Sequence, residues 1–199
     1  PQYFDPAERA LIARRLRPET VFVDIGANVG AYALYVAALA GPRARIVAVE
    51  PQPDMYERLI FNIRQNEFAT VKAIECAIAD EDRVVTLFVD LENRARASIR
   101  MLFAEGGAHA QVTTPAVTLA ALAEAETLTR IDMMKVDVAG AEDIALEPFF
   151  ERAPAALWPR LLIVDANGLA LAPALARRLA ACGYARALAT RSNIVFERA

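Results

Sequence analysis

The sequence predicts an α/β fold in which a mostly parallel β-sheet carries helices on both faces. Apolar runs rich in β-branched residues recur in the first half of the chain, at residues 20–25, 45–50 and 71–77. The first two runs are each followed by a stretch of helical composition or spacing, at residues 28–40 and 51–66. Alternation of strands and helices favours a parallel sheet, because each helix returns the chain to the same edge.

The first strand, turn and helix contain the most informative stretch, residues 24–30, which read Asp-Ile-Gly-Ala-Asn-Val-Gly. Gly26 allows a sharp turn at the carboxyl end of the strand. Gly30 allows the helix to begin close to a ligand or to the neighbouring strand. The free N–H groups at such a helix start can receive an anionic group. The spacing fits neither G-x-G-x-x-G nor a P-loop, which leaves an acid followed by G-x-x-x-G.

The remaining elements are assigned in chain order. An N-terminal helix is expected over residues 5–16, with Asp5-Pro6 as its cap and first turn. Residues 91–111 form the least regular stretch. The other predicted elements are strands at 84–89, 111–117, 130–138 and 160–165, helices at 118–125, from 140 onward and at 171–182, and a closing hairpin at 184–189 and 193–196.

Composition restricts the class of protein. A chain of 199 residues fits a single domain with a substantial core. A net charge of −3 and a pI of about 5.3 argue against a broad nucleic-acid surface. The uncharged stretch between Asp24 and Arg43 is interrupted by three glycines, Asn28 and Pro42, so we reject a membrane span.

The two cysteines, Cys76 and Cys182, match no metal spacing and no C-x-x-C pattern. We therefore expect reduced, buried thiols and no metal site. No secretory signal is visible. The expected location is the cytoplasm.

Two acids end consecutive predicted strands, Asp24 after the first apolar run and Glu50 after the second. Carboxyl ends of parallel strands meet at one edge of a sheet, where ligands of such sheets bind. This arrangement suits a nucleoside whose ribose hydroxyls pair with one carboxylate and whose charged tail lies along the glycine turn.

Four segments together carry a resemblance to a known family, namely residues 21–30, 48–51 (Ala-Val-Glu-Pro), 135–142 (Lys-Val-Asp-Val-Ala-Gly-Ala-Glu) and 62–66 (Asn-Ile-Arg-Gln-Asn). With these segments in their order along the chain, the sequence resembles the FkbM-like family of S-adenosylmethionine-dependent methyltransferases over about residues 20–165. The resemblance implies a Rossmann-like class I methyltransferase fold with a mostly parallel seven-stranded sheet, a C-terminal antiparallel hairpin and helices on both faces. Residues 1–199 would form one domain, with a helical cover at 1–19, a cofactor-binding half at 20–90 and a substrate-side half at 91–199.

The resemblance also implies S-adenosylmethionine as cofactor. Asp24 would face the methionine ammonium, which is compatible with a role as cap of the turn. Glu50 would accept the ribose hydroxyls or stand as a solvated acid. Asn28 would bond the methionine carboxylate or cap the helix, and the backbone of Ala77 would contact the adenine. The complete set of expected cofactor-binding residues is Asp24, Gly26, Asn28, Gly30, Glu50, Pro51 and Ala77.

Three residues are catalytic candidates. Asp137 ends the strand at 130–138 and could hold the cofactor's amino group, orient a substrate hydroxyl or act as base. Glu142 is either a surface acid matched to a helix N-terminus or a group that reaches the acceptor. His109 is either a base that titrates near neutral pH or an exposed loop residue. Lys135 points the same way as Asp137 and is expected to form a buried ion pair with it or with Asp24.

Other residues near the expected acceptor site carry smaller roles. Arg94, Arg96 and Arg100 could hold a phosphate or carboxylate of the substrate, or form a solvated face. Ser98 occupies a position where the family often has serine. The family usually has Glu where this chain has Ala139, and often has Glu near the end of the last predicted parallel strand, where this chain has Asp165.

The expected activity is O-methylation of a hydroxyl on a small molecule, sugar or natural product, with a small-molecule or glycan acceptor as partner. One alternative is a methyltransferase that acts on an amine, protein or RNA. The other is a non-catalytic domain that binds the cofactor or a partner, which the absence of a carboxylate at Ala139 leaves open.

Overall fold

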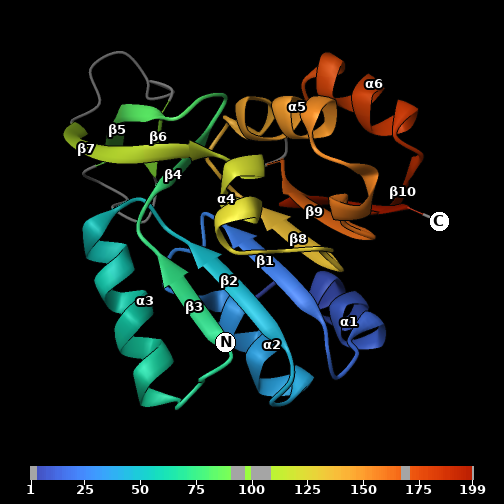
Figure 1. Ribbon diagram of the computed structural model, residues 1–199, viewed down its shortest axis with the longest axis horizontal. Coiled ribbons are helices and arrows are strands. Elements are labelled where there is room, and N and C mark those ends of the chain that lie inside the picture. The colour runs from blue at the N-terminus through green and yellow to red at the C-terminus, as the bar shows by residue number, and fades with distance from the viewer. Residues whose placement is uncertain (1–3, 91–96, 100–108, 167–170, 199) are drawn as a thin grey trace.

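The computed structural model describes residues 4–90, 97–99, 109–166 and 171–198 (Figure 1). Its main sheet has seven strands in the spatial order β10-β11-β9-β8-β1-β2-β3. Five strands run parallel, and the chain closes with an antiparallel hairpin at one edge. The strands are β1 (Val21–Ile25), β2 (Arg45–Val49), β3 (Val71–Ile74), β8 (Met133–Val136), β9 (Leu161–Asp165), β10 (Tyr184–Ala189) and β11 (Asn193–Arg198). The predicted Rossmann-like sheet with its C-terminal hairpin is confirmed.

One face of this sheet is covered by the helices α1 (Pro6–Arg15), α2 (Ala31–Ala40) and α3 (Pro53–Gln65). Their buried residues Ile12, Val36 and Leu59 share one core cluster with Phe22 and Ile46, which point to that face from β1 and β2. The same face of β1 carries Asp24, because alternate residues of a strand point to the same side.

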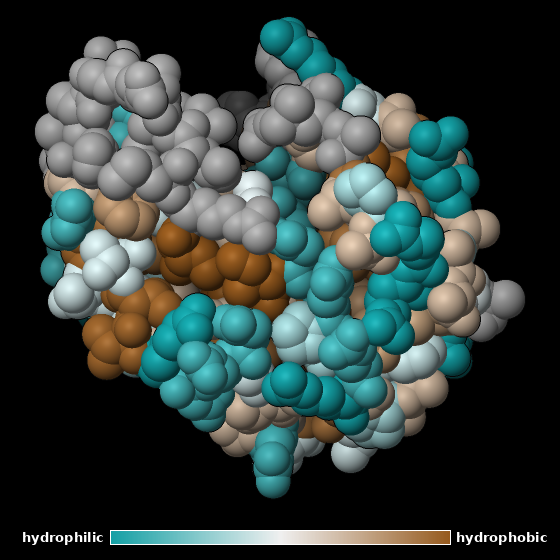
Figure 2. Space-filling model, turned by 90° about the horizontal axis from the view of Figure 1, so that it is seen from above, coloured by the Kyte–Doolittle hydropathy of each residue, from teal (hydrophilic) through white to brown (hydrophobic). Residues whose placement is uncertain are grey.

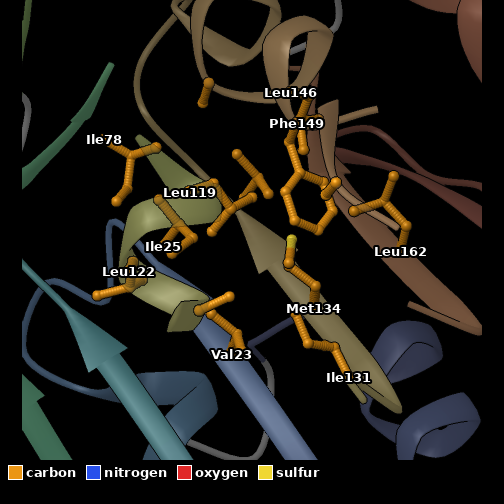
Figure 3. Close-up of a cluster of buried hydrophobic side chains, with 14 of the residues drawn as sticks. Val23, Ile25, Ile78, Leu119, Leu122, Ile131, Met134, Leu146, Phe149 and Leu162 are labelled. Carbon is orange, nitrogen blue, oxygen red and sulfur yellow. The ribbon is translucent and has the colours of Figure 1, made fainter. Parts of the chain in front are cut away.

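The opposite face is covered by α4 (Leu119–Ala125), α5 (Glu142–Arg152) and α6 (Pro173–Ala181). Val23 of β1 and Met134 of β8 point into this second cluster, where they meet Leu119 of α4 and Leu146 and Phe149 of α5 (Figure 3). Burying a Leu or Phe side chain stabilises the fold by about 2 kcal/mol relative to leaving it exposed. The sheet is therefore buried on both faces, as a parallel sheet requires.

A second, four-stranded sheet lies beyond the carboxyl ends of the main strands (Figure 1). Its strands are β4 (Ala77–Ala79), β5 (Arg83–Asp90), β6 (Ala97–Ser98) and β7 (His109–Thr118), in the order β4-β7-β5-β6. The prediction of one strand over 71–77 was wrong. The strand ends at Ile74, and the chain resumes as β4, which pairs in parallel with β7 instead of continuing beside β2.

Two further boundaries differ from the sequence prediction. The helix expected from residue 28 begins at Ala31, because Asn28 and Gly30 both have positive φ, at 51° and 95°. The strand expected over 130–138 is limited to Met133–Val136. The division of the chain into the parts 1–19, 20–90 and 91–199 stays a prediction.

Seen from above, apolar side chains gather in a patch in the middle of the molecular face, with hydrophilic residues bordering them (Figure 2). Within the described residues, no helix combines the length and the hydropathy needed to cross a membrane.

Candidate functional site

The turn between β1 and α2 brings together the loops that follow three strands. The N–H groups of Gly26 and Ala27 both donate to the carbonyl oxygen of Val49, each at 2.9 Å. Gly26 has a φ of 74°, and a Cβ atom there would lie 1.8 Å from the backbone oxygen of Asp137. Only glycine fits at this position, because the backbone of β1 passes directly against the loop after β8.

Gly30 lies against a side chain of α3 and not against the loop after β8. A Cβ atom on Gly30 would lie 2.7 Å from Cδ1 of Leu59, so the missing side chain lets α3 pack against the start of α2. The side-chain amide of Asn62, also on α3, donates to the carbonyl oxygen of Val29 at 2.9 Å. The Asn-Ile-x-x-Asn segment thus fastens α3 to the glycine turn.

Asp24 points from β1 toward the first turn of α2. Its side chain is 2% exposed, and Oδ2 accepts a hydrogen bond from the N–H of Ala33 at 2.9 Å. Burial raises the pKa of this carboxyl to about 7, against the opposing effects of the Lys135 ammonium and the Ala33 N–H. Asp24 therefore bonds the first turn of α2 and not the glycine turn, which the sequence predicted it to cap.

Glu50 follows β2 and lies on the other side of the same turn. It is 5% exposed, and its two oxygens accept the backbone N–H groups of Asn28 at 2.7 Å and of Gln52 at 2.9 Å. Burial raises its pKa to about 7, while these two hydrogen bonds act in the other direction. Glu50 is thus a fixed, buried acid and not a solvated strand end. The side-chain oxygen of Asn28 accepts the N–H of Val29 at 2.8 Å, so this bond lies within the turn and does not cap α2.

Lys135 of β8 is the buried cation beside these acids. It is 2% exposed, and its Nζ lies 3.3 Å from Oδ2 of Asp137 and 5.6 Å from the ring centre of Tyr32. The Asp137 side chain is 44% exposed, so one carboxylate of this ion pair faces solvent. Asp165 at the end of β9 is a further acid that interacts with Lys135. Burial raises the pKa of Asp165 to about 7, and the Lys135 charge opposes this shift. The expected ion pair between Lys135 and Asp137 is present, but only its ammonium is buried.

The loop after β8 is shaped by Glu142, the first residue of α5. Its Oε1 accepts the N–H groups of Val138 and Gly140, both at 3.1 Å, and burial raises the pKa of this carboxyl. Ala139 has a φ of 49° and Gly140 a φ of 91°, which give the loop its reversal. Glu142 therefore fixes the backbone of the loop that directly follows Asp137.

A small pocket opens beside the glycine turn. Pro51 and Ala77, both predicted from the sequence, line it together with Gly26 and Ser98. The Oγ of Ser98 donates to the carbonyl oxygen of Val138 at 3.4 Å. The remaining lining is apolar and consists of Ile25, Val49, Cys76, Ile78, Leu87, Ala97, Ile99 and Val138. Burial raises the pKa of the Cys76 thiol to about 11, so Cys76 acts there as an apolar group. Cys182, expected to be buried, is only half-buried.

Most of the predicted site residues lie at one edge of the main sheet, whereas four others lie wholly or partly outside the described residues. The backbone of His109 begins β7 opposite Asp90, and its side chain lies outside the described residues. Arg94, Arg96 and Arg100 also lie outside them. Among the residues that are described, no group of three or more His, Cys, Asp or Glu could hold a metal ion.

A polar network next to Lys135 was not predicted. The sequence suggested that the side chain of Asp5 caps α1, but it makes no capping hydrogen bond to this helix. Its Oδ2 instead accepts the hydroxyl of Tyr32 at 2.7 Å and the side-chain amide of Asn193 at 3.1 Å. The same amide donates to Glu8 at 2.9 Å, and Glu8 is 1% exposed. The sequence signal for this network was an acidic residue, Glu8, beside the apolar residues of the N-terminal helix. The partners of Glu8 could not be identified, because they lie more than 180 residues away in the sequence.

Comparisons with known proteins place this geometry in a family. The family model described as "Methyltransferase FkbM domain" matches residues 24–184. The chain is 48% identical over 48 residues to the AMB antimetabolite synthetase AmbE of Pseudomonas aeruginosa and 40% identical over 58 residues to the methyltransferase sdnD of Sordaria araneosa. These segments cover 24% and 29% of the chain, and 2% and 22% of the two relatives.

Solved structures share the fold at low sequence identity. Methyltransferase FkbM from Methylobacillus flagellatus matches with a TM-score of 0.57 and 14% identity, over 92% of this chain and 44% of that one. The precorrin-6y C5,15-methyltransferase from Geobacter metallireducens has a TM-score of 0.58 and 16% identity, with 96% and 87% covered. Fibrillarin from Aeropyrum pernix, solved with natively bound S-adenosylmethionine, has a TM-score of 0.53 and 15% identity, with 96% and 73% covered. Because the family model spans most of the chain and the fold agrees with it, the chain belongs to the FkbM family of S-adenosylmethionine-dependent methyltransferases.

Proposed function

We propose that this chain transfers a methyl group from S-adenosylmethionine to a hydroxyl oxygen of a small molecule or glycan. The observation that carries the proposal is the pair of buried acids at neighbouring strand ends, Asp24 and Glu50, on either side of one glycine turn. Family membership makes a methyl donor the natural ligand of that pair.

The donor set fits such a cofactor. Glu50 is fixed by two backbone N–H groups, and each carboxylate oxygen keeps a lone pair with which to accept a ribose hydroxyl. Asp24 would face the methionine ammonium, with Gly26, Asn28 and Gly30 forming the turn along the methionine portion. The apolar pocket at Pro51 and Ala77 suits the adenine ring.

Bound S-adenosylmethionine supplies an electrophilic sulfonium methyl. The chain's own contribution is to position the acceptor and to take its proton. We assign the proton to the carboxylate of Asp137, which is partly exposed at the same sheet edge and is oriented by the Lys135 ammonium at 3.3 Å. Glu142 supports this role by holding the loop through Val138 and Gly140, and His109 stays an alternative base.

A hydroxyl acceptor needs a base of this kind, because an alcohol is a weak nucleophile until its proton is removed. The name of one relative, an antimetabolite synthetase, is in keeping with a small-molecule acceptor. The net charge of −3 disfavours RNA.

The test is transfer of a tritiated methyl group from S-adenosylmethionine to a panel of sugars, alcohols and amines. We expect label in a hydroxyl compound. Asp137→Asn should reduce the rate by about 100-fold or more while cofactor affinity changes little, because general-base catalysis contributes about that factor. Transfer only to amines would refute the choice of acceptor. Tight cofactor binding without transfer to any acceptor or cell extract would identify a non-catalytic domain.

A further inference from the structure

Arginines converge at the opposite end of the main sheet, where the parallel strands begin. Two adjoining hollows lie there, of about 270 Å³ and about 450 Å³, and they share Arg17, Asp132 and Arg160. The first hollow is lined by Thr20, Met133 and Leu161 from the starts of β1, β8 and β9, so it lies one strand length from Asp24 and Asp137. A five-residue strand spans about 16 Å, which separates this region from the candidate cofactor site. The six arginines of the two hollows are Arg15, Arg17, Arg43, Arg130, Arg160 and Arg198, and we call them the arginine cluster.

The carboxylates of this region neutralise only half of the cluster. Glu197 pairs with Arg15 at 3.0 Å, Glu19 with Arg43 at 3.2 Å and Asp132 with Arg130 at 3.2 Å. These three acids against six arginines leave a local charge of +3, although the whole chain carries −3. The positive charge is therefore concentrated at one end of the molecule.

Three arginines have no acid partner in the part of the chain that the structure describes. Arg198 is held in place, since its guanidinium lies 5.0 Å from the ring centre of Trp158 and donates to the carbonyl oxygen of Ala155 at 2.9 Å. Arg17 and Arg160 line both hollows, are exposed, and make no side-chain hydrogen bond within the described residues. Their backbones are fixed, because Arg17 N–H donates to Thr20 Oγ1 at 2.9 Å and Arg160 N–H donates to the oxygen of Asp132 at 3.1 Å.

Arg17 and Arg160 line the same two hollows, and neither guanidinium is neutralised by an acid within the described residues. A guanidinium presents a planar fork of N–H donors that matches the oxygens of a phosphate. The two hollows that Arg17 and Arg160 line, of about 270 Å³ and about 450 Å³, have room for a small phosphate-bearing anion. We propose that the arginine cluster is a binding site for a small phosphate-bearing anion, separate from the methyl-transfer site.

The test is isothermal titration of the protein with inorganic pyrophosphate and, separately, with inorganic phosphate, with sodium chloride adjusted to hold ionic strength constant. We expect saturable binding of at least pyrophosphate at millimolar concentration or below. Arg17→Gln/Arg160→Gln should weaken it tenfold or more, and each single substitution by a smaller factor. The matched control is Arg177→Gln, which removes an exposed arginine on α6 that lines neither hollow and should change the affinity less than twofold.

Two further measurements separate this site from the others. Excess S-adenosylhomocysteine should not displace pyrophosphate, whereas displacement would place the anion at the cofactor site and overturn the proposal. Thermal unfolding without ligand should be cooperative for both the double variant and Arg177→Gln, which would show that both are folded. Absence of saturable binding to the unaltered protein, or equal weakening by the double variant and by Arg177→Gln, would also overturn it.

Discussion

Asp24 and Lys135 are register partners in adjacent parallel strands, and each is only 2% exposed. Register partners point to the same face of a sheet, so the ammonium stands beside the buried carboxylate of the candidate cofactor site. Burial alone would favour a neutral Asp24, and the Lys135 charge lowers its pKa back to about 7. The nearby Lys135 charge therefore keeps part of the Asp24 carboxyl ionised near neutral pH.

Replacing this buried cation should be costly. Lys135→Met leaves the acids around it without a counter-charge, and we expect a loss of about 3 kcal/mol in the free energy of unfolding at pH 8, measured by urea denaturation. The loss should shrink toward pH 5, because burial raises the pKa of both Asp24 and Asp165 to about 7 and these two acids are then mostly protonated. Lys72→Met, which removes an exposed partner of Glu126, is the control and should cost less than about 1 kcal/mol. An equal loss from Lys135→Met at both pH values would contradict this electrostatic explanation.

Gly26 should tolerate no side chain. In Gly26→Ala the new Cβ would meet the backbone oxygen of Asp137 at 1.8 Å, and we expect a loss of about 3 kcal/mol or more in stability. Gly183→Ala is a matched control, because Gly183 has a similar φ of 84° but nothing within 4 Å of a Cβ atom. It should cost only about 1 kcal/mol for the left-handed backbone. Thermal or urea unfolding of the two variants measures the difference, and similar losses would show that φ alone matters at Gly26.

The two asparagines of α3 should have different roles. Asn62→Ala removes the hydrogen bond to Val29, so we expect about 1 kcal/mol of destabilisation and weaker binding of S-adenosylhomocysteine, because the glycine turn loses an anchor. Asn66→Ala removes an exposed bond to the carbonyl oxygen of Asn62 at the end of the helix and should leave ligand affinity unchanged. Calorimetry on both variants checks this, and equal effects on affinity would refute the anchoring role.

Ligand affinity should depend on pH through the buried acids. Glu50 accepts ribose hydroxyls in the proposed complex as a carboxylate, and its pKa is raised to about 7. Such a group is about nine-tenths ionised at pH 8 and about one-tenth at pH 6, so affinity for S-adenosylhomocysteine should fall about tenfold between them. Calorimetric titrations at several pH values measure this.

Protein stability should change in the opposite direction over the same range. Because the folded-state pKa of Glu50 lies above its ordinary value of 4.5, protonation favours the folded state, and stability rises as the pH falls from about 7 toward 4.5. Weaker binding at pH 6 would then not reflect unfolding. An affinity that is constant from pH 6 to pH 8 would rule out Glu50 as the titrating acceptor.

The parts of the fold that depend on local pattern could be predicted from the sequence. The apolar run before Asp24, the helix formers after Gly30 and the second acid at Glu50 follow one another closely, and they identify the first βαβ unit. The hairpin at 184–189 and 193–196 was identifiable for the same reason, because strand composition and short spacing suffice.

Features that depend on distant partners could not be predicted. Ala77 looks like the end of the strand that begins at Val71, but β4 leaves that strand because β7, over thirty residues later, supplies its partner. The Asp5 side chain looks like a helix cap until Tyr32 and Asn193 are placed beside it. Glu142 likewise could have been a surface acid, since only the reversal at Ala139 brings the Val138 N–H back to it.

The most direct test of the central claim is calorimetric titration of S-adenosylmethionine into the unaltered protein, Glu50→Ala and Glu57→Ala at pH 8. Glu57 is an exposed acid on α3, so its removal controls for the change in net charge. We predict saturable binding by the unaltered protein and Glu57→Ala, and at least a tenfold loss in Glu50→Ala. No binding by the unaltered protein, or unchanged binding by Glu50→Ala, would contradict the assignment of this sheet edge as the cofactor site.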